Sequence, residues 1–263
     1  MIQKLLKLFK KKPRNSGQER FICNLKPDPK DERDYVAKAI PEHKLPSKIS
    51  FRKYTRDLVK QQGRIGSCGS HAFATAIEIM LRKYKPDWFI ELSERFHYYV
   101  VRQPEFMNTY PRDSGQYLRM GAKVLHKVGI SPEVLCPYDW RKYNEKPNIF
   151  AYGFARWWKI KSYQKCYDIQ TIKSELADGL PVIFGARVYE SFLKNRDGLI
   201  KFPTRNDKYA GGHAMVIIGY DDEINSFEVI NSWGKMWGRY GYCWIPYDWM
   251  KEYMLDAWTI SIA

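Results

Sequence analysis

The sequence lacks several features that would assign it to common classes of protein. No apolar run reaches the roughly 18 residues that a membrane-spanning helix needs. Bases interrupt every short apolar pair near the N-terminus, so no secretory signal is indicated. No CxxC pair is present to suggest a zinc ribbon or a redox motif. We therefore expect no transmembrane segment and a reducing compartment, with the cytoplasm as the simplest location.

The cysteines also argue against a disulfide framework. There are five of them, an odd number, so they cannot all pair within the chain. In a reducing compartment, we expect Cys23, Cys136, Cys166 and Cys243 to be buried thiols. The fifth, Cys68, stands in a different setting, next to glycines.

Composition indicates a folded protein with a basic end. Of the 263 residues, 44% are hydrophobic and 16% are aromatic, which is enough to form a core. The net charge is +15, and residues 1–14 contain bases but no acid. This stretch fits either a basic amphipathic arm, giving weak contact with an anionic membrane or nucleic acid, or a solvated terminus.

Prolines and charges separate this end from the rest of the chain. Residues 26–35 (KPDPKDERDY) and 41–50 (PEHKLPSKIS) have little to bury. We assign residues 1–45 to a basic N-terminal arm or short pro-segment and residues 46–263 to one domain. In the domain, helical periodicity precedes short apolar runs bounded by turns, which favours an α+β fold. Helices are expected at 68–84, 116–128 and 169–176, and strands at 182–184, 214–218, 227–230 and 242–245.

Three separated segments carry residue types suited to nucleophilic catalysis. Cys68 begins a helix, where the positive end of the helix dipole favours a thiolate, although a buried structural cysteine would look similar. His213 follows two glycines at the start of an apolar strand, and Asn231 stands at the end of another. Each of these two residues alone also fits a structural role.

Taken together, the segments resemble the papain family of cysteine peptidases, in particular its bacterial, archaeal and viral members. Residues 62–68 read QGRIGSC, residues 211–221 read GGHAMVIIGYD, and residues 227–242 read FEVINSWGKMWGRYGY. Residues 136–139 (CPYD) and 173–184 also look like landmarks of that family. From Cys68 to His213 there are 145 positions, within the about 130–150 typical of papain and the cathepsins.

The resemblance implies a two-lobed fold, with a helical lobe, an antiparallel barrel-like lobe and the active site between them. It implies that Cys68 attacks, that His213 acts as base and acid, and that Asn231 orients the ring of His213. Two further roles are implied, an oxyanion donor at Gln62 and a shield over the triad at Trp233. The remaining implied sites, for substrate binding, are Gly66, Ser67, Gly115 and Gly212. No metal or organic cofactor is implied, and the partner would be a protein or peptide substrate.

Some points depart from the family or stay open. Ile65 stands where relatives often have a disulfide cysteine, and Gly69 where eukaryotic members have an aromatic residue. The helical neighbour His71 is expected to pack in the core. The alternatives to a peptidase are an amidase or acyltransferase with the same triad, a non-catalytic binding protein, and a basic nucleic-acid binder.

The basic arm gives a first prediction. Because the chain contains no recognisable nucleic-acid motif, binding to duplex DNA should be unspecific and should weaken steeply with added salt. A salt titration that compares the whole chain with a chain lacking residues 1–20 measures this. Sequence-selective binding, or binding unaffected by the deletion, would contradict it.

Overall fold

The computed structural model describes residues 21–262, so the basic stretch at residues 1–14 lies outside the described residues. Besides short 3₁₀ turns, the helices are α2 (Cys68–Tyr84), α3 (Glu94–Val101), α4 (Leu118–Lys127), α5 (Ile149–Ala155), α6 (Ile169–Ala177), α7 (Glu190–Leu193) and α8 (Tyr247–Tyr253). The strands are β1 (Lys48–Ser50), β2 (Ile160–Cys166), β3 (Val182–Tyr189), β4 (Tyr209–Asp221), β5 (Ser226–Ile230), β6 (Tyr242–Pro246) and β7 (Met254–Ile262).

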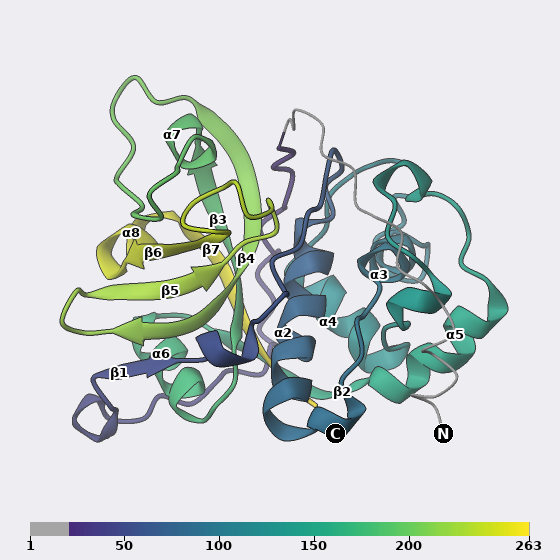
Figure 1. Cartoon of the computed structure of the whole chain (residues 1–263), viewed down its shortest axis with the longest axis horizontal. Coiled ribbons are helices and arrows are strands. Elements are labelled where there is room, and N and C mark those ends of the chain that lie inside the picture. Colours follow the sequence, from purple (N-terminus) through teal and green to yellow (C-terminus); the bar gives the residue numbers. More distant parts are fainter. Residues whose placement is uncertain (1–20, 263) are drawn as a thin grey trace.

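The strands form one antiparallel sheet in the order β2-β7-β3-β4-β5-β6, with β1 added to β4. Figure 1 shows this sheet on one side of the molecule, α3, α4 and α5 on the other, and α2 between them. The predicted α+β class with a helical part and a strand-rich part is confirmed. The sheet is open rather than a closed barrel, because β2 and β6 lie at its two ends without pairing to each other.

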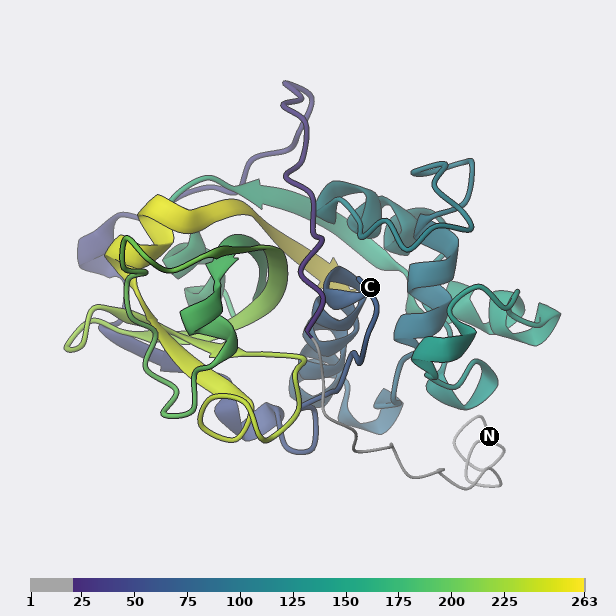
Figure 2. The same cartoon turned by 90° about the horizontal axis from the view of Figure 1, so that it is seen from above.

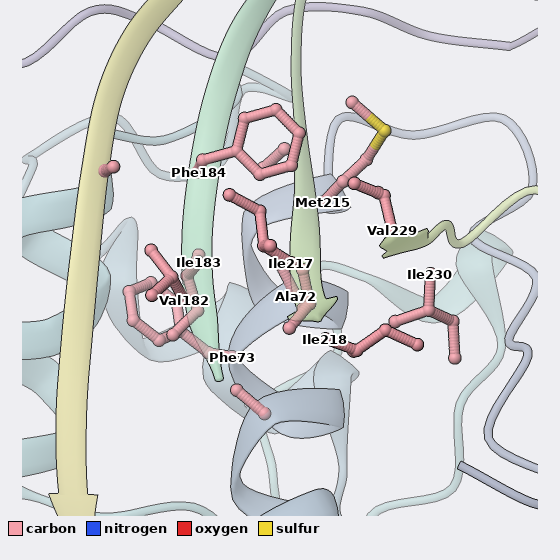
Figure 3. Close-up of a cluster of buried hydrophobic side chains, with 14 of the residues drawn as sticks. Ala72, Phe73, Val182, Ile183, Phe184, Met215, Ile217, Ile218, Val229 and Ile230 are labelled. Carbon is pink, nitrogen blue, oxygen red and sulfur yellow. The ribbon is translucent and has the colours of Figure 1, made fainter. Parts of the chain in front are cut away.

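Helix α2 is the element that joins the two halves. Its sequence predicts an apolar stripe, yet every residue from Cys68 to Leu81 is buried, so neighbours cover all of its sides. In Figure 3, Ala72 and Phe73 of α2 lie beside apolar side chains of β3 and β4, which include Val182, Ile217 and Ile218. This packing holds the first turn of α2 against β4.

The predicted helices at 68–84, 116–128 and 169–176 and the four predicted strands are present, most of them with different ends. Helix α3 escaped prediction because its eight residues are too few for helical periodicity to be recognised, although Ser93 caps it by accepting the Phe96 N–H. Strand β7 escaped because it follows α8 directly, with no turn residues between them.

Part of the predicted arm lies on the domain. Figures 1 and 2 show the chain after residue 21, in purple, running between the sheet and the helices. Asn24 pairs with Gly212 and Lys26 with Tyr117 in isolated parallel bridges, and Val36 pairs with Lys165 of β2. Leu25 and Ala37 are buried. No helix among the described residues is long and apolar enough to cross a membrane.

The central packing gives a second prediction. Replacing the buried Ile217 with Ala should lower the free energy of unfolding by about 2–5 kcal/mol, because methyl groups are lost and a cavity remains. The matched change Ile224→Ala, at a side chain that is 52% exposed, should alter it by less than about 0.5 kcal/mol. Urea unfolding measures both, and equal effects would contradict the placement of Ile217.

Candidate active site

Cys68 is the first residue of α2 and is fully buried. Its sulfur is reached by the backbone N–H of Ala214, which directly follows His213 on β4. The cysteine and histidine segments, 145 positions apart, therefore meet. Burial raises the pKa of the Cys68 thiol to about 11, and the backbone N–H groups around the sulfur oppose this only in part. In this arrangement, burial outweighs the thiolate-favouring helix N-terminus that the sequence suggests.

His213 is buried on β4 and bonded to Asn231, 2.7 Å from Nε2 to Oδ1. The same Oδ1 accepts the Ser232 N–H at 2.7 Å, so Asn231 presents its oxygen and Nε2 carries the hydrogen. That leaves Nδ1 as the unprotonated nitrogen, and it has no hydrogen-bond partner among the described residues. Burial lowers the pKa of His213 to about 3, although the bond to Asn231 raises it somewhat. The imidazole is therefore neutral, with a bare lone pair.

Trp233 stacks on the histidine of this pair. The ring centroids of Trp233 and His213 are 4.1 Å apart, and the ring planes are 21° apart. Phe21 also stacks on Trp233, at 4.3 Å and 15°. The apolar rings exclude water from the neighbourhood of the bond between His213 and Asn231, which strengthens that bond.

Gln62 is buried and fixed at both ends of its amide. Its Oε1 accepts from the Ser232 hydroxyl at 2.9 Å, and its Nε2 donates to the Ile65 carbonyl at 3.1 Å. The same Nε2 donates to the carbonyl of Ile22 at 3.2 Å. Sequence reasoning did not single out Ser232, yet the residue stands inside the NSWG motif, directly after Asn231. Its position there was the signal that could have identified it.

Three of the four expected substrate-binding residues face one segment of the arm. A side-chain carbon placed at Gly66 would lie 1.9 Å from Oδ1 of Asn24, and one placed at Gly115 would lie 1.9 Å from its backbone oxygen. Gly212 accepts a hydrogen bond from the Leu25 N–H at 2.9 Å. The bare glycine positions therefore let a peptide backbone approach closely.

Ser67 is placed differently. It is fully buried, and its hydroxyl lies 2.9 Å from the hydroxyl of Tyr138 and 3.3 Å from Nδ1 of His71. Its side chain thus belongs to an internal network. His71, expected in the core, is buried there and meets Tyr138 edge to face at 4.7 Å. Tyr138 also donates to the Gln62 carbonyl at 2.6 Å, a support that sequence reasoning missed.

Residues 21–28, here called the N-terminal segment, lie over this site. Phe21 stacks on Trp233, the Ile22 carbonyl accepts from Gln62, and the Leu25 side chain packs against Gly185 of β3. The Lys26 N–H donates to the Gln116 carbonyl at 3.1 Å. Cys23, expected to be fully buried, is only half-buried within this segment. As a result, the Cys68 thiol has no contact with solvent in this structure.

Charged side chains attach residues 28–34 to the domain. The Asp28 carboxylate accepts the Arg119 N–H at 3.1 Å and the Trp258 indole N–H at 2.8 Å. The Arg119 guanidinium holds Asp34 through two bonds of 2.7 and 2.6 Å. Residues 26–35, which look in the sequence as if they have little to bury, are thus held by ion pairs and hydrogen bonds, and not by apolar contacts.

Comparison with known proteins agrees with this geometry. The family model of papain family cysteine proteases matches residues 45–258. An uncharacterised peptidase C1-like protein of Acanthamoeba polyphaga mimivirus is 33% identical over 215 residues, which are 76% of this chain and 68% of that protein. Cathepsin C of Schistosoma mansoni is 25% identical over 203 residues, which are 70% of this chain but only 43% of that protein.

A solved structure gives the same result. Xylellain, a cysteine protease from Xylella fastidiosa, is 34% identical with a TM-score of 0.85, covering 95% of this chain and all 100% of that one. The chain belongs to the papain family of cysteine proteases. It is therefore a cysteine-type peptidase, a hydrolase, similar to the bacterial enzyme and the viral protein.

The ionic attachment gives a third prediction. Arg119→Met keeps an apolar stem but removes both guanidinium bonds to Asp34, which then keeps only the Lys165 ammonium at 3.9 Å, and the loss costs about 1.5–3 kcal/mol. Amide hydrogen exchange should therefore accelerate across residues 21–37. The matched change Arg33→Met removes the exposed pair with Asp31 and should leave that exchange unaltered. Equal protection in both variants would show that the ion pair does not hold the segment.

Proposed function

We propose that the chain hydrolyses peptide bonds in proteins or peptides through a triad of Cys68, His213 and Asn231, with a thioester acyl-enzyme as intermediate. The observation that carries this is the state of the imidazole. Its Nε2–H is held by Asn231, and its bare Nδ1 belongs to a residue next to Ala214, whose N–H reaches the Cys68 sulfur. A base with one nitrogen fixed and the other free is what activation of a thiol requires.

The reaction follows from these positions. Nδ1 of His213 takes the proton from Cys68, and the Oδ1 of Asn231 stabilises the imidazolium that forms. The thiolate attacks the carbonyl carbon of the substrate, and His213 then gives the proton to the departing amine. Water, deprotonated by the same imidazole, attacks the thioester, which releases the acid and restores the thiol.

Gln62 serves the oxyanion in this proposal. Its Nε2 already donates to a peptide carbonyl, that of Ile22, within the covered site. A substrate carbonyl in a similar place would develop negative charge on attack, and the amide, together with the Cys68 N–H, would stabilise that charge. Because Ser232 and Ile65 hold the amide in place, little reorganisation is needed when the charge appears.

The described conformation is closed in this proposal, with the N-terminal segment acting as part of a pro-segment. A substrate has to displace residues 21–28 in order to reach Cys68. In the closed state, the raised pKa of Cys68 and the lowered pKa of His213 both favour the neutral pair over thiolate and imidazolium. Water that enters on opening removes the burial that causes both shifts.

The role of Gln62 gives a fourth prediction. Gln62→Ala should lower kcat for a peptide substrate about a hundredfold to a thousandfold, because one oxyanion donor is lost. Gln103→Ala, at an amide that donates only to the Tyr99 carbonyl, should leave kcat unaltered. Cys68→Ser should remove labelling by an epoxide thiol trap as well as activity. A Gln62→Ala enzyme with wild-type kcat would refute the assigned role.

The closed state gives a fifth prediction. Leu25→Asp places a charge at a buried side chain that packs on Gly185 and should open the site, whereas Val36→Asp changes a side chain that is 49% exposed and should not. In the wild type, alkylation of Cys68 by iodoacetamide should be slow near neutral pH, because it requires the segment to open, and it should rise as the pH approaches about 11. In Leu25→Asp, it should already be fast near neutral pH, since an opened thiol can form the ion pair with His213. Identical pH profiles would contradict a covering role for residues 21–28.

A further inference from the structure

Cys23 differs from the other free thiols of the chain. Cys68, Cys136, Cys166 and Cys243 are buried, while Cys23 is half-buried and accessible in part to solvent. It lies within the N-terminal segment, between two residues that both contact the loop leading to Cys68. On one side, the Ile22 carbonyl accepts from Gln62, and on the other, the side chain of Asn24 fills the space over Gly66.

A third contact joins Cys23 to Gly211 on β4, the strand that carries His213. Gly211 stands two positions before His213 on β4, with a φ of +130°. A side-chain carbon built there would lie 2.9 Å from Cβ of Cys23 and 1.8 Å from its backbone oxygen. Cys23 can occupy this place only because residue 211 has no side chain. It is thus held between the nucleophile's loop and the histidine strand.

The two sulfurs also interact electrostatically. Burial raises the pKa of Cys23, and the charge of Cys68 raises it further. The contacts of Ile22, Asn24 and Gly211 place Cys23 beside the loop and the strand that surround Cys68. Both thiols are reduced in this structure.

We propose that Cys23 is a resolving thiol for Cys68, so that oxidation joins the two sulfurs in a disulfide that locks the N-terminal segment over the active site. This inference rests on the proposed function of Cys68 as the nucleophile. Reduction of the bond returns the segment to a reversible, non-covalent contact. The site is therefore a redox modification site as well as a catalytic one.

The oxidant is a low-molecular-weight disulfide, such as oxidised glutathione. When the segment opens, the Cys68 thiolate attacks one sulfur of oxidised glutathione, forms a mixed disulfide and releases one glutathione thiolate. The Cys23 thiolate then attacks the sulfur of Cys68, breaks the mixed disulfide and releases the second. Two protein thiols are oxidised, one disulfide is reduced to two glutathiones, and the two protons pass to the glutathione thiolates.

Hydrogen peroxide gives a second route to the same disulfide, and this route affects whether the enzyme can regain activity. Hydrogen peroxide oxidises the Cys68 thiolate to a sulfenic acid and is itself reduced to water. Attack by Cys23 on that sulfur releases a second water and forms the same disulfide. Without Cys23, the sulfenic acid can be oxidised again to the sulfinic acid, which thiols do not reduce. The disulfide between Cys23 and Cys68 therefore keeps the nucleophile in a form that reduction can restore.

The test uses the full chain and reads the bond by mass. The protein is treated with oxidised glutathione, free thiols are blocked with iodoacetamide, and tryptic peptides are analysed by mass spectrometry. The expected product is a dithiothreitol-sensitive pair of the peptides spanning 21–30 and 65–82, since trypsin does not cleave between Lys26 and Pro27. It should be absent from Cys23→Ser and Cys68→Ser and should remain in the matched buried-thiol control Cys166→Ser.

A peroxide challenge gives the functional readout. After treatment with hydrogen peroxide and then dithiothreitol, the wild type should regain most of its peptidase activity, whereas Cys23→Ser should regain less than a tenth. Cys23→Ala repeats the test with no hydroxyl at this position. The proposal is overturned if Cys68 of the wild type ends as a glutathione adduct or sulfinic acid with Cys23 alkylated, or if the Cys23 variants recover as well as the wild type.

These outcomes test the disulfide between Cys23 and Cys68 separately from the proposed peptidase function. The cross-link is detected without any peptidase assay, so a chain that cross-links but never cleaves peptides when reduced rejects the peptidase alone. If a reduced chain cleaves peptides but gives no linked pair of peptides 21–30 and 65–82 after oxidation, the disulfide between Cys23 and Cys68 alone is rejected.

Discussion

The packing of helix α2 against strand β4 is the constraint on which the rest of the site depends. It places the first residue of the helix, Cys68, against the strand that carries His213, although the two are far apart in the chain. The helix can lie this close because small and apolar residues such as Ala72 and Phe73 face the sheet. Asn231 then needs only to follow the adjacent strand β5 to reach the ring, since β4 and β5 pair directly.

In the proposed function, the N-terminal segment occupies the surfaces that a substrate backbone would use. The glycines that admit it, Gly66, Gly115 and Gly212, are those that the family resemblance assigns to substrate binding. Two kinds of interaction attach it and the residues that follow to the rest of the protein. Stacking and apolar contact act at Phe21 and Leu25, and ion pairs and hydrogen bonds act further along, at residues 28–34. Coverage of the site thus follows from ordinary complementarity and needs no large inhibitory domain.

Much of this was accessible from the sequence, and the misses have physical reasons. The helix at Cys68 and the strand at His213 were predictable because periodicity and bounding glycines mark them clearly. Helix α3 was not, since its eight residues make little more than two turns, too few for a periodic stripe to be recognised. The docking of residues 21–28 was hidden because their partners, such as Arg119 and Gln116, lie about a hundred positions away, and a charged stretch looks solvated until its counter-charges are located.

The attachment of the N-terminal end to the domain has an apolar part and an ionic part, and this affects how the N-terminal segment can leave the active site. After Asp28 and before Asp34, the residues Pro29, Lys30, Glu32 and Arg33 are exposed. A single backbone cut there would leave residues 21–28 held by their own contacts, including those of Asp28, but no longer tethered to the domain. Their effective concentration at the site would fall from that of a linked group to that of a free peptide, so dilution alone would carry them away. Cleavage of one exposed peptide bond would then uncover the active site irreversibly.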